Sequence, residues 1–314
     1  ALMSVLRSAL LWASQNPRME RGVRSSRVMR PLVSRFMPGE TIDDALTVAR
    51  GLHASGTPVI ITYLGENVTT EAAADDTLAE YQRLVAALQP LGDGAHVSIK
   101  LTQFGWDLNK DRALDRVRIL STLVAANGSM LAIDMESSAY VDSTVEAYAE
   151  LARGVRHVAI CLQAYLHRTP GDVERLLGVQ PYIRLVKGAY REPASAAIQS
   201  RAEIDARYRE LGRMLLRASG QGARVVFGTH DVALVRRLRD DARELGLAET
   251  AFEIQMLYGI QDDGRRQLAT SGHKTRVLIS YGKAWYAWFM RRLAEKPSNL
   301  VLLSRNLLSR GAVQ

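Results

Sequence analysis

Two short runs, His157-Val-Ala-Ile-Cys-Leu-Gln163 and Tyr182-Ile-Arg-Leu-Val-Lys187, decide the fold of this chain. Each run is apolar on both faces and rich in β-branched residues, and a helical stretch lies between them. Such runs are typical of parallel strands that helices cover on both sides. Six further runs of this type are Pro58–Tyr63, His96–Leu101, Met130–Asp134, Arg224–Phe227, Phe252–Met256 and Thr275–Ile279. Eight strands that alternate with helices predict a (β/α)8 barrel.

An open, doubly wound sheet is the alternative fold, because it also alternates strands with helices. That fold needs a glycine-rich phosphate-binding turn, whereas the first run leads into Leu64-Gly65-Glu66-Asn67. A helix over Ile42–Ala54 is expected, with Thr41 as its N-cap. Because no linker divides residues 41–300, we expect one α/β domain, a TIM-type barrel over residues 41–314.

Composition narrows the class of protein. The 314 residues include a single cysteine, Cys161, so we expect neither an internal disulfide nor a metal site. The apolar stretches are far shorter than the roughly 20 residues that cross a membrane, and we expect a cytoplasmic protein. The net charge of +8 permits attraction to phosphate or anionic lipid. No helix-turn-helix or stacking-platform signature accompanies it, so we do not expect nucleic acid as a partner.

Residues 1–40 form the second predicted unit, a basic helical arm. An apolar segment, Leu2–Trp12, precedes most of the positive charge, which is the reverse of a signal peptide, and we expect mature structure. One interpretation is an amphipathic basic helix that contacts the inner face of a membrane, and the other is a cap over the bottom of a domain, with its arginines in solvent. The arginines of the arm are Arg7, Arg18, Arg21, Arg24, Arg27, Arg30 and Arg35.

Polar side chains recur where the predicted strands end. Because these ends meet at one face of a barrel, where active sites lie, their coincidence predicts a functional site. Any one of them alone would be weak evidence, since single polar residues near strand ends are commonly structural. The residues concerned are Lys100, Asp134, Gln163, Arg184, Lys187, Thr229, His230 and Gln255.

A helix is predicted after the last strand, within Tyr281–Glu295. Its aromatic residues occur at helical spacing, and Arg291, Arg292 and Glu295 are close enough in sequence to share another face. Two guanidinium groups could clamp a carboxylate if the helix lies across the mouth of a pocket. The alternative is a solvated helix end with an ion pair between Arg292 and Glu295.

Together these blocks resemble the proline dehydrogenase family, the flavin enzymes of proline catabolism, in their stand-alone bacterial form. The resemblance covers the chain from Thr41 to about Leu300. It implies a distorted (β/α)8 barrel that binds FAD noncovalently, with the last helix over the strand ends. The matching blocks follow the family's order: Ser98–Leu101, Ile133–Glu136, Leu162–Tyr165, Arg184–Tyr190, Gly228–Asp231, Phe252–Leu257 and Phe289–Glu295.

The same resemblance assigns roles to residues. It implies hydrogen bonds from Arg184 and Gln163 to the flavin ring, and a place for Thr229 and His230 near the pyrophosphate. The cofactor contacts that it implies are Gln163, Arg184, Val186, Lys187, Gly188, Ala189, Tyr190, Arg191, Thr229, His230 and Gln255.

Around the substrate, the resemblance places Arg291 and Arg292 on the carboxylate, with Lys100 beside them. Glu295 would fix an arginine. Asp134 would orient Lys100 or a neighbouring group, and Leu257 would line the apolar part of the pocket.

The reaction implied is hydride transfer from L-proline to flavin N5, which yields Δ1-pyrroline-5-carboxylate and passes electrons to a membrane quinone. One position departs from the family. Leu278 stands where members generally carry a tyrosine that packs on the substrate ring. Hydroxyproline or another secondary amino acid is therefore the alternative substrate. A catalytically inactive barrel that binds a partner is the alternative outside enzymes.

Overall fold

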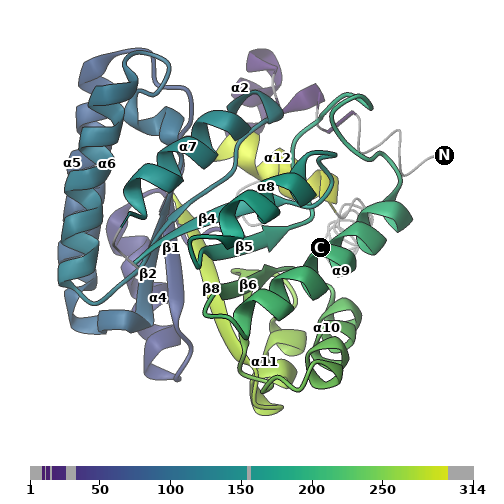
Figure 1. Cartoon of the computed structure of the whole chain (residues 1–314). Helices are drawn as coiled ribbons and strands as arrows, with labels where there is room; N and C mark the ends of the chain where they lie inside the picture. The colour runs from purple at the N-terminus through teal and green to yellow at the C-terminus, as the bar shows by residue number, and fades with distance from the viewer. Residues whose placement is uncertain (1–8, 11, 15, 26–32, 154–156, 296–314) are drawn as a thin grey trace, which may run out of the picture.

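Eight parallel strands close into a barrel in the order β1 to β8, with β8 paired to β1 (Figure 1). The computed structural model describes residues 9–10, 12–14, 16–25, 33–153 and 157–295. The strands are β1 (Val59–Tyr63), β2 (Ala95–Ile99), β3 (Leu131–Ile133), β4 (Val158–Gln163), β5 (Tyr182–Val186), β6 (Arg224–Gly228), β7 (Phe252–Leu257) and β8 (Lys274–Tyr281). The (β/α)8 barrel predicted from the alternating runs is confirmed.

Helices α2 and α4 precede β1, a helix follows each strand, and the helices after β1 to β7 return the chain to the start of the next strand. The helices are α2 (Pro17–Ser25), α4 (Ile42–Ala54), α5 (Glu71–Leu88), α6 (Lys110–Ala126), α7 (Val141–Leu151), α8 (Thr169–Leu177), α9 (Arg201–Ser219), α10 (Val232–Glu244), α11 (Asp262–Thr270) and α12 (Trp285–Glu295). Three 3-10 segments are η1 (Gln89–Gly94), η2 (Leu101–Phe104) and η3 (Ser138–Tyr140). None of the helices described is long and apolar enough to cross a membrane.

The predicted start of α4 is confirmed in detail. The side-chain oxygen of Thr41 accepts a hydrogen bond from the Asp44 amide at 3.2 Å. Asp44 accepts one in return from the Thr41 amide at 3.0 Å, which completes a capping box. The helix then packs against β8 and β1.

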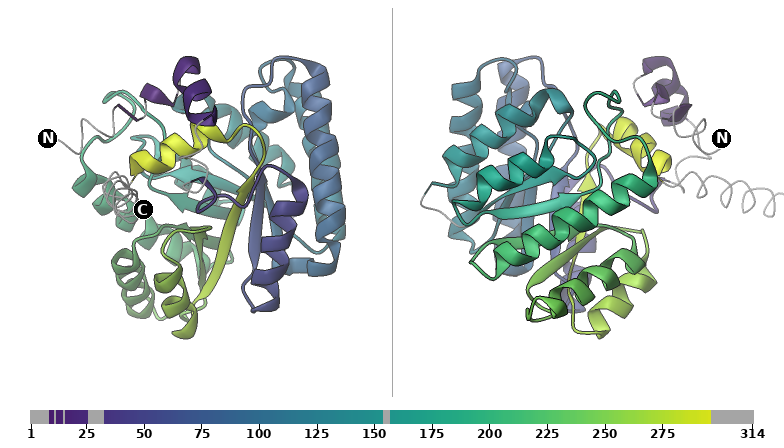
Figure 2. Two further views of the ribbon diagram at one scale, coloured as in Figure 1. Left: turned by 180° about the vertical axis from the view of Figure 1, so that it is seen from behind. Right: turned by 45° about the vertical axis from the view of Figure 1, so that its right-hand side comes forward.

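The last helix does not take its usual place in the barrel wall. After β8, the chain turns at Gly282, and α12 lies across the carboxyl ends of the strands (Figure 2). Because α4 already covers β8 and β1, the wall stays closed without α12. This displacement is the distortion that the family resemblance implied, and it brings Arg291 and Arg292 to the top of the barrel.

The described part of the N-terminal segment packs on α12. Phe36 contacts Phe289 with ring centroids 6.1 Å apart, and the Tyr286 hydroxyl donates a hydrogen bond to the Ala13 carbonyl at 2.8 Å. The Trp285 indole N–H donates to Glu40 at 2.8 Å. The described segment therefore packs as a cap on α12 above the carboxyl ends of the strands, so the interpretation that placed this cap at the bottom of a domain is wrong about its position. The domain boundary at residue 40 stays a prediction.

Replacement of Phe36 by alanine should destabilise the protein. Phe36 is buried in the apolar cluster between the arm and α12, so Phe36→Ala is expected to lower the free energy of unfolding by about 3 kcal/mol. Urea unfolding followed by fluorescence measures this change. Val179→Ala, at an exposed position, is the matched control and should stay within about 0.5 kcal/mol of the parent. Equal stability of the two variants would show that the arm does not pack on α12.

Candidate active site

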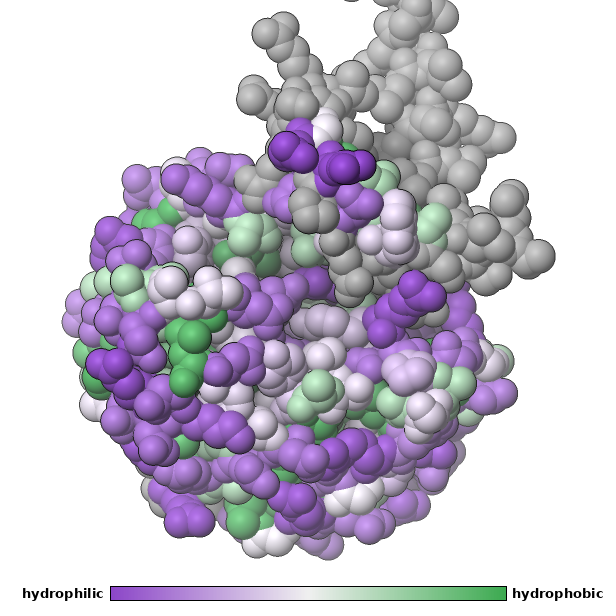
Figure 3. All heavy atoms as spheres, turned by 90° about the horizontal axis from the view of Figure 1, so that it is seen from above, coloured by the Kyte–Doolittle hydropathy of each residue, from purple (hydrophilic) through white to green (hydrophobic). Residues whose placement is uncertain are grey.

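A cavity of about 610 Å³ opens at the carboxyl ends of the strands, beneath α12. Most of the residues predicted for the site line it. Seen from above, the surface of this face is mainly hydrophilic, and its hydrophobic residues are scattered rather than gathered (Figure 3). The predicted residues that line the cavity are Lys100, Asp134, Gln163, Arg184, Val186, Lys187, Gly188, Ala189, Tyr190, Thr229, His230, Gln255, Leu257, Leu278, Arg291 and Arg292.

Two predicted residues are placed differently. Arg191 is exposed and does not line the cavity, although it directly follows Tyr190. The side chain of Glu295 lies outside the described part of the chain, so its predicted contact with an arginine stays a prediction.

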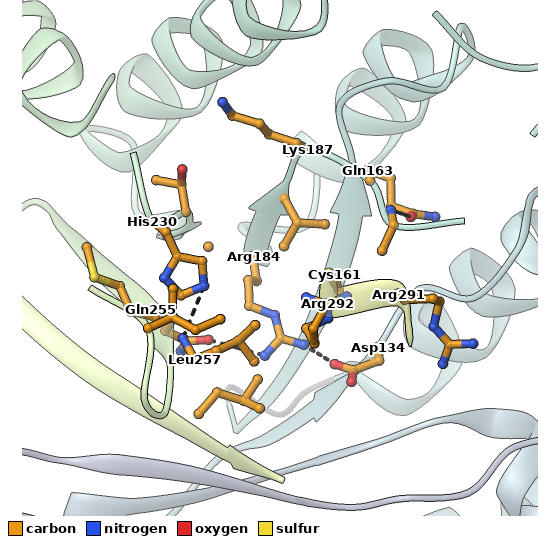
Figure 4. Close-up of a pocket in the computed structure, with 18 of the residues that line it drawn as sticks. Asp134, Cys161, Gln163, Arg184, Lys187, His230, Gln255, Leu257, Arg291 and Arg292 are labelled. Carbon is orange, nitrogen blue, oxygen red and sulfur yellow. Dashed lines mark hydrogen bonds and ion pairs between the residues drawn. The ribbon is translucent and has the colours of Figure 1, made fainter. Parts of the chain in front are cut away.

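Arg184 lies at the centre of the cavity floor (Figure 4). One end of its guanidinium pairs with Asp134, and Nη1 donates a hydrogen bond to Gln255 Oε1 at 3.2 Å. Burial is the largest single effect and disfavours the charged form, but Asp134 and Cys161 together outweigh burial and raise the pKa of Arg184. The group is therefore a permanent positive charge inside the barrel.

Asp134 pairs with Arg184, whereas Lys100 was the first partner expected. It accepts hydrogen bonds from Ser98 Oγ at 3.1 and 3.2 Å, in addition to its ion pair with Arg184. Among the described contacts, it orients Arg184 and not Lys100. Of the two alternatives, Lys100 or a neighbouring group, the structure thus favours the second.

Hydrogen bonds of Gln163 and Glu136 connect the ends of β2, β3, β4 and β5. Gln163 Nε2 donates to the Glu136 carbonyl at 2.8 Å, and Gln163 Oε1 accepts from the Ala189 amide at 3.3 Å. The Glu136 carboxylate accepts from the Thr102 amide at 3.2 Å and from the Thr102 hydroxyl at 2.6 Å. The turn that holds Lys100 is therefore tied to the segment after β5.

The segment after β5 requires a glycine. Gly188 has a φ of +124°, and a Cβ at this position would collide with the ring of Tyr165. The amide of Tyr165 donates to the Lys187 carbonyl at 3.0 Å, and its hydroxyl donates to the Tyr190 carbonyl at 3.3 Å. Tyr165 thus holds this segment through two hydrogen bonds. The lack of a side chain at Gly188 lets the backbone of the segment line the cavity.

Glu66 is a site residue that sequence reasoning missed. It holds Arg291 in a forked ion pair, with Nη1 3.0 Å from Oε1 and Nη2 3.3 Å from Oε2. The Arg291 guanidinium also lies over the Tyr190 ring, 5.1 Å from its centroid. Burial alone would raise the pKa of Glu66, but Arg291 and Lys100 outweigh it and lower that pKa. The sequence signal for Glu66 was its position three residues after β1, because other site residues also follow strands.

The other side of the cavity is formed by β6 and the start of α10. Asp231 caps α10 by accepting from the Leu234 amide at 3.0 Å, so the positive end of the helix dipole lies beside Thr229 and His230. Lys187 Nζ lies 2.5 Å from Asp205 and 3.4 Å from Asp231. This side combines features that favour a bound phosphate group. No cluster able to hold a metal ion occurs in the part of the chain that the structure describes.

The fold and the cavity define a class: an enzyme on a TIM-type barrel, whose charged pocket at the strand ends suits a carboxylate and a large cofactor. A sequence model of the family described as proline dehydrogenase matches residues 45–305. The chain is 34% identical over 307 residues to the proline dehydrogenase of Deinococcus radiodurans, across 96% of this chain and 97% of that protein. It is 30% identical over 306 residues to proline dehydrogenase 1 of Bacillus subtilis, across 98% and 100% of the two chains. This chain belongs to the proline dehydrogenase family.

Solved structures show the same fold. Proline utilization A (PutA) from Bdellovibrio bacteriovorus, inactivated by N-propargylglycine, superposes with a TM-score of 0.79 at 24% identity. A mutant PutA from Bradyrhizobium japonicum superposes with a TM-score of 0.72 at 20% identity. The matches cover 92% and 84% of this chain, which spans only 36% and 30% of those longer chains.

Burial of Glu136 predicts a pH-dependent stability. Burial raises the pKa of Glu136, so the folded state holds this proton more tightly than the unfolded state. The stability that the group contributes is present below its unfolded pKa of about 4.3 and is lost as pH rises through the folded pKa. The unfolding free energy of the parent minus that of Glu136→Gln should therefore fall as pH rises above 4.

Urea unfolding across the acidic to neutral range measures this difference. Glu174→Gln, at an exposed position on α8, is the control for the loss of a surface carboxylate. A flat difference for Glu136→Gln would contradict the raised pKa.

Proposed function

We propose that this protein oxidises L-proline to Δ1-pyrroline-5-carboxylate, with FAD held noncovalently in the cavity and a quinone as the electron acceptor. Membership of the proline dehydrogenase family supports the reaction class. The observation that carries the finer proposal is the fixed charge of Arg184 in the same cavity as Arg291 and Arg292.

The chain's residues fit a flavin. Arg184 lines the cavity, and its buried Nε has no oxygen acceptor among the described residues. Next to it, the segment from Val186 to Tyr190 offers backbone amides, while Thr229, His230 and the start of α10 suit a pyrophosphate. Gln163 and Gln255 add amide groups on either side of Arg184. When bound, FAD supplies at N5 the acceptor for a hydride from the carbon beside the ring nitrogen of proline.

The cationic residues have a common electrostatic effect. Arg184 is held charged by Asp134 and would stabilise negative charge that develops beside it during reduction. Arg291 and Arg292 would bind the substrate carboxylate, with Glu66 holding Arg291 in place. Lys100 adds a further positive group to the wall.

The same charges favour the reactive form of the substrate. A secondary ammonium has no lone pair to form an imine, so the amine of proline must be neutral before a hydride can leave. Nearby cations lower the pKa of an ammonium because they disfavour a second positive charge. Of the six lysine and arginine side chains that line the cavity, four would lie near the substrate: Lys100, Arg184, Arg291 and Arg292.

Leu278 supports the alternative substrate. It lines the cavity and packs on an apolar cluster inside the barrel that includes Ile60, its register partner on β1. A leucine offers neither the flat face nor the hydroxyl of a tyrosine, so it leaves room for a larger ring. Hydroxyproline or another secondary amino acid is the second candidate.

We place the protein in the cytoplasm, with a peripheral contact to the inner face of the membrane where the quinone would be reduced. Arg18 and Arg21 are exposed on α2 and would approach anionic lipid.

Anaerobic titration tests the substrate and the cofactor together. The purified protein should show a flavin spectrum, and L-proline should bleach the oxidised band, because reduction removes that absorbance. A soluble quinone added to the same cuvette should restore it. L-alanine, which has the carboxylate but no secondary amine, is the control and should leave the band unchanged.

Three outcomes would change the proposal. Bleaching by hydroxyproline but not by proline would assign the alternative substrate. A colourless protein after incubation with FAD would refute the cofactor. A bleached protein that a soluble quinone does not reoxidise would refute the acceptor.

Arg292→Gln should separate substrate binding from cofactor binding. An amide cannot replace the charge-assisted hydrogen bonds of a guanidinium, so kcat/KM for proline should fall about 10- to 100-fold, mainly through KM. FAD content should not change. Arg207→Gln, which removes a surface arginine paired with Glu210, is the control. An unaltered KM in Arg292→Gln would remove this residue from the carboxylate site.

A further inference from the structure

The interior of the barrel below the cavity contains an unusual buried ion pair. Barrel interiors are filled mainly by branched apolar side chains. Here Arg276 Nε donates to Glu253 Oε1 at 2.9 Å, and only 7% and 15% of these two side chains are exposed. Neither residue lines the cavity. A buried ion pair is weak evidence for stability, because desolvation offsets most of the attraction. Stability alone therefore does not explain why Arg276 and Glu253 occupy the interior of the barrel.

The ion pair is the lower part of a continuous chain of hydrogen bonds. Gln255 Nε2 donates to Glu253 Oε1 at 2.8 Å, and Gln255 Oε1 accepts from Arg184 Nη1 at 3.2 Å. Arg184 then pairs with Asp134. Figure 4 shows the upper part, with Arg184 between Gln255 and Asp134. The chain thus runs from inside the barrel to the cavity floor.

The lower end of the chain is anchored to backbone. Arg276 Nη1 donates to the carbonyls of Val59 at 3.0 Å, Gly94 at 3.3 Å and Asp93 at 3.4 Å. These carbonyls come from β1 and from the end of η1, which precedes β2. Because barrel backbone moves little, Arg276 holds Glu253 at a defined position.

This chain of hydrogen bonds also sets the orientation of the Gln255 side-chain amide. An ionised carboxylate only accepts hydrogen bonds and a guanidinium only donates them, whereas an amide does both. With Glu253 on one side and Arg184 on the other, Gln255 has one orientation that satisfies both neighbours. The Gln255 oxygen is therefore directed to Arg184 and fixes one edge of its guanidinium.

We propose that Glu253 is a positioning residue for Arg184, which it orients through Gln255, and that Arg276 holds Glu253 in place. The consequence for flavin binding rests on the proposed function, but the orientation of Arg184 does not. Loss of Glu253 would leave the Gln255 amide free to turn away from Arg184, so the Arg184 guanidinium would keep its ion pair with Asp134 but rotate more freely.

A double substitution tests this proposal without leaving a buried charge. Glu253→Leu combined with Arg276→Met removes both ions together, a change that proteins commonly tolerate. Gln255 then loses its acceptor. Arg224→Met is the control for loss of an arginine near the same end of the barrel, because Arg224 begins the neighbouring strand β6, where it contacts the Tyr182 ring and the Met130 sulfur. Thermal unfolding checks that each variant is folded.

The first readout is the mobility of Arg184 in the full chain as purified. Arginine side chains labelled with nitrogen-15 give separate Nη signals when rotation of the guanidinium is hindered, and Arg184→Lys identifies the signals by their loss. We expect separate Arg184 signals in the parent and in Arg224→Met, and averaged signals in the double variant. Unchanged Arg184 signals in a folded double variant would overturn the proposal, as would equal averaging in Arg224→Met.

The second readout is the affinity for FAD, measured by fluorescence titration. The dissociation constant should rise about tenfold in the double variant, which corresponds to the loss of about one well-oriented hydrogen bond. The two proposals fail separately. A parent that binds no FAD refutes the cofactor while the signals of Arg184 still test its orientation. Normal FAD binding with unchanged Arg184 signals refutes the positioning role alone.

Discussion

A guanidinium buried inside a closed barrel is the constraint on which the arrangement of the site depends. Arg184 is almost completely enclosed, and a charge in that environment is stable only with compensating partners. Asp134 supplies the opposite charge and Gln255 an amide oxygen. These two residues come from either side of β5 in the strand order, so the closed sheet itself brings them together. Their own contacts, with Ser98 and Glu253, extend the same requirement further into the barrel.

The fold was largely predictable because the strands are apolar on both faces. These apolar runs located all eight strands, and the errors were confined to the strand ends. The run His96–Leu101 corresponds to β2 at Ala95–Ile99, because Leu101 is apolar but already begins η2. Hydrophobicity reports burial, and it does not show where the ladder of hydrogen bonds stops. The same limit explains why Tyr281, expected in the last helix, ends β8 instead.

The sequence predicted which residues belong to the site better than it predicted which side chains contact each other. In a barrel, residues near the carboxyl ends of the strands lie on one face. Lys100, Arg184 and Gln255 could therefore be grouped from the sequence. Pairing depends on geometry between distant segments. Arg291 and Glu66 are 225 positions apart, and sequence spacing favoured Glu295 as the partner of an arginine. Asp134 likewise lies within reach of several cations, and the sequence alone could not choose Arg184 over Lys100.

Closure of the barrel by its first and last strands has a consequence for synthesis. β1 pairs with β8, and the hydrogen bond from Arg276 to the Val59 carbonyl spans 217 positions of the chain. While the ribosome makes the protein from its N-terminus, the outer edge of β1 has no native partner until nearly the whole chain has emerged. Unpaired edges readily add strands from other molecules. The edge of β1 therefore stays open to wrong pairing until β8 has been made, and only then can the barrel close.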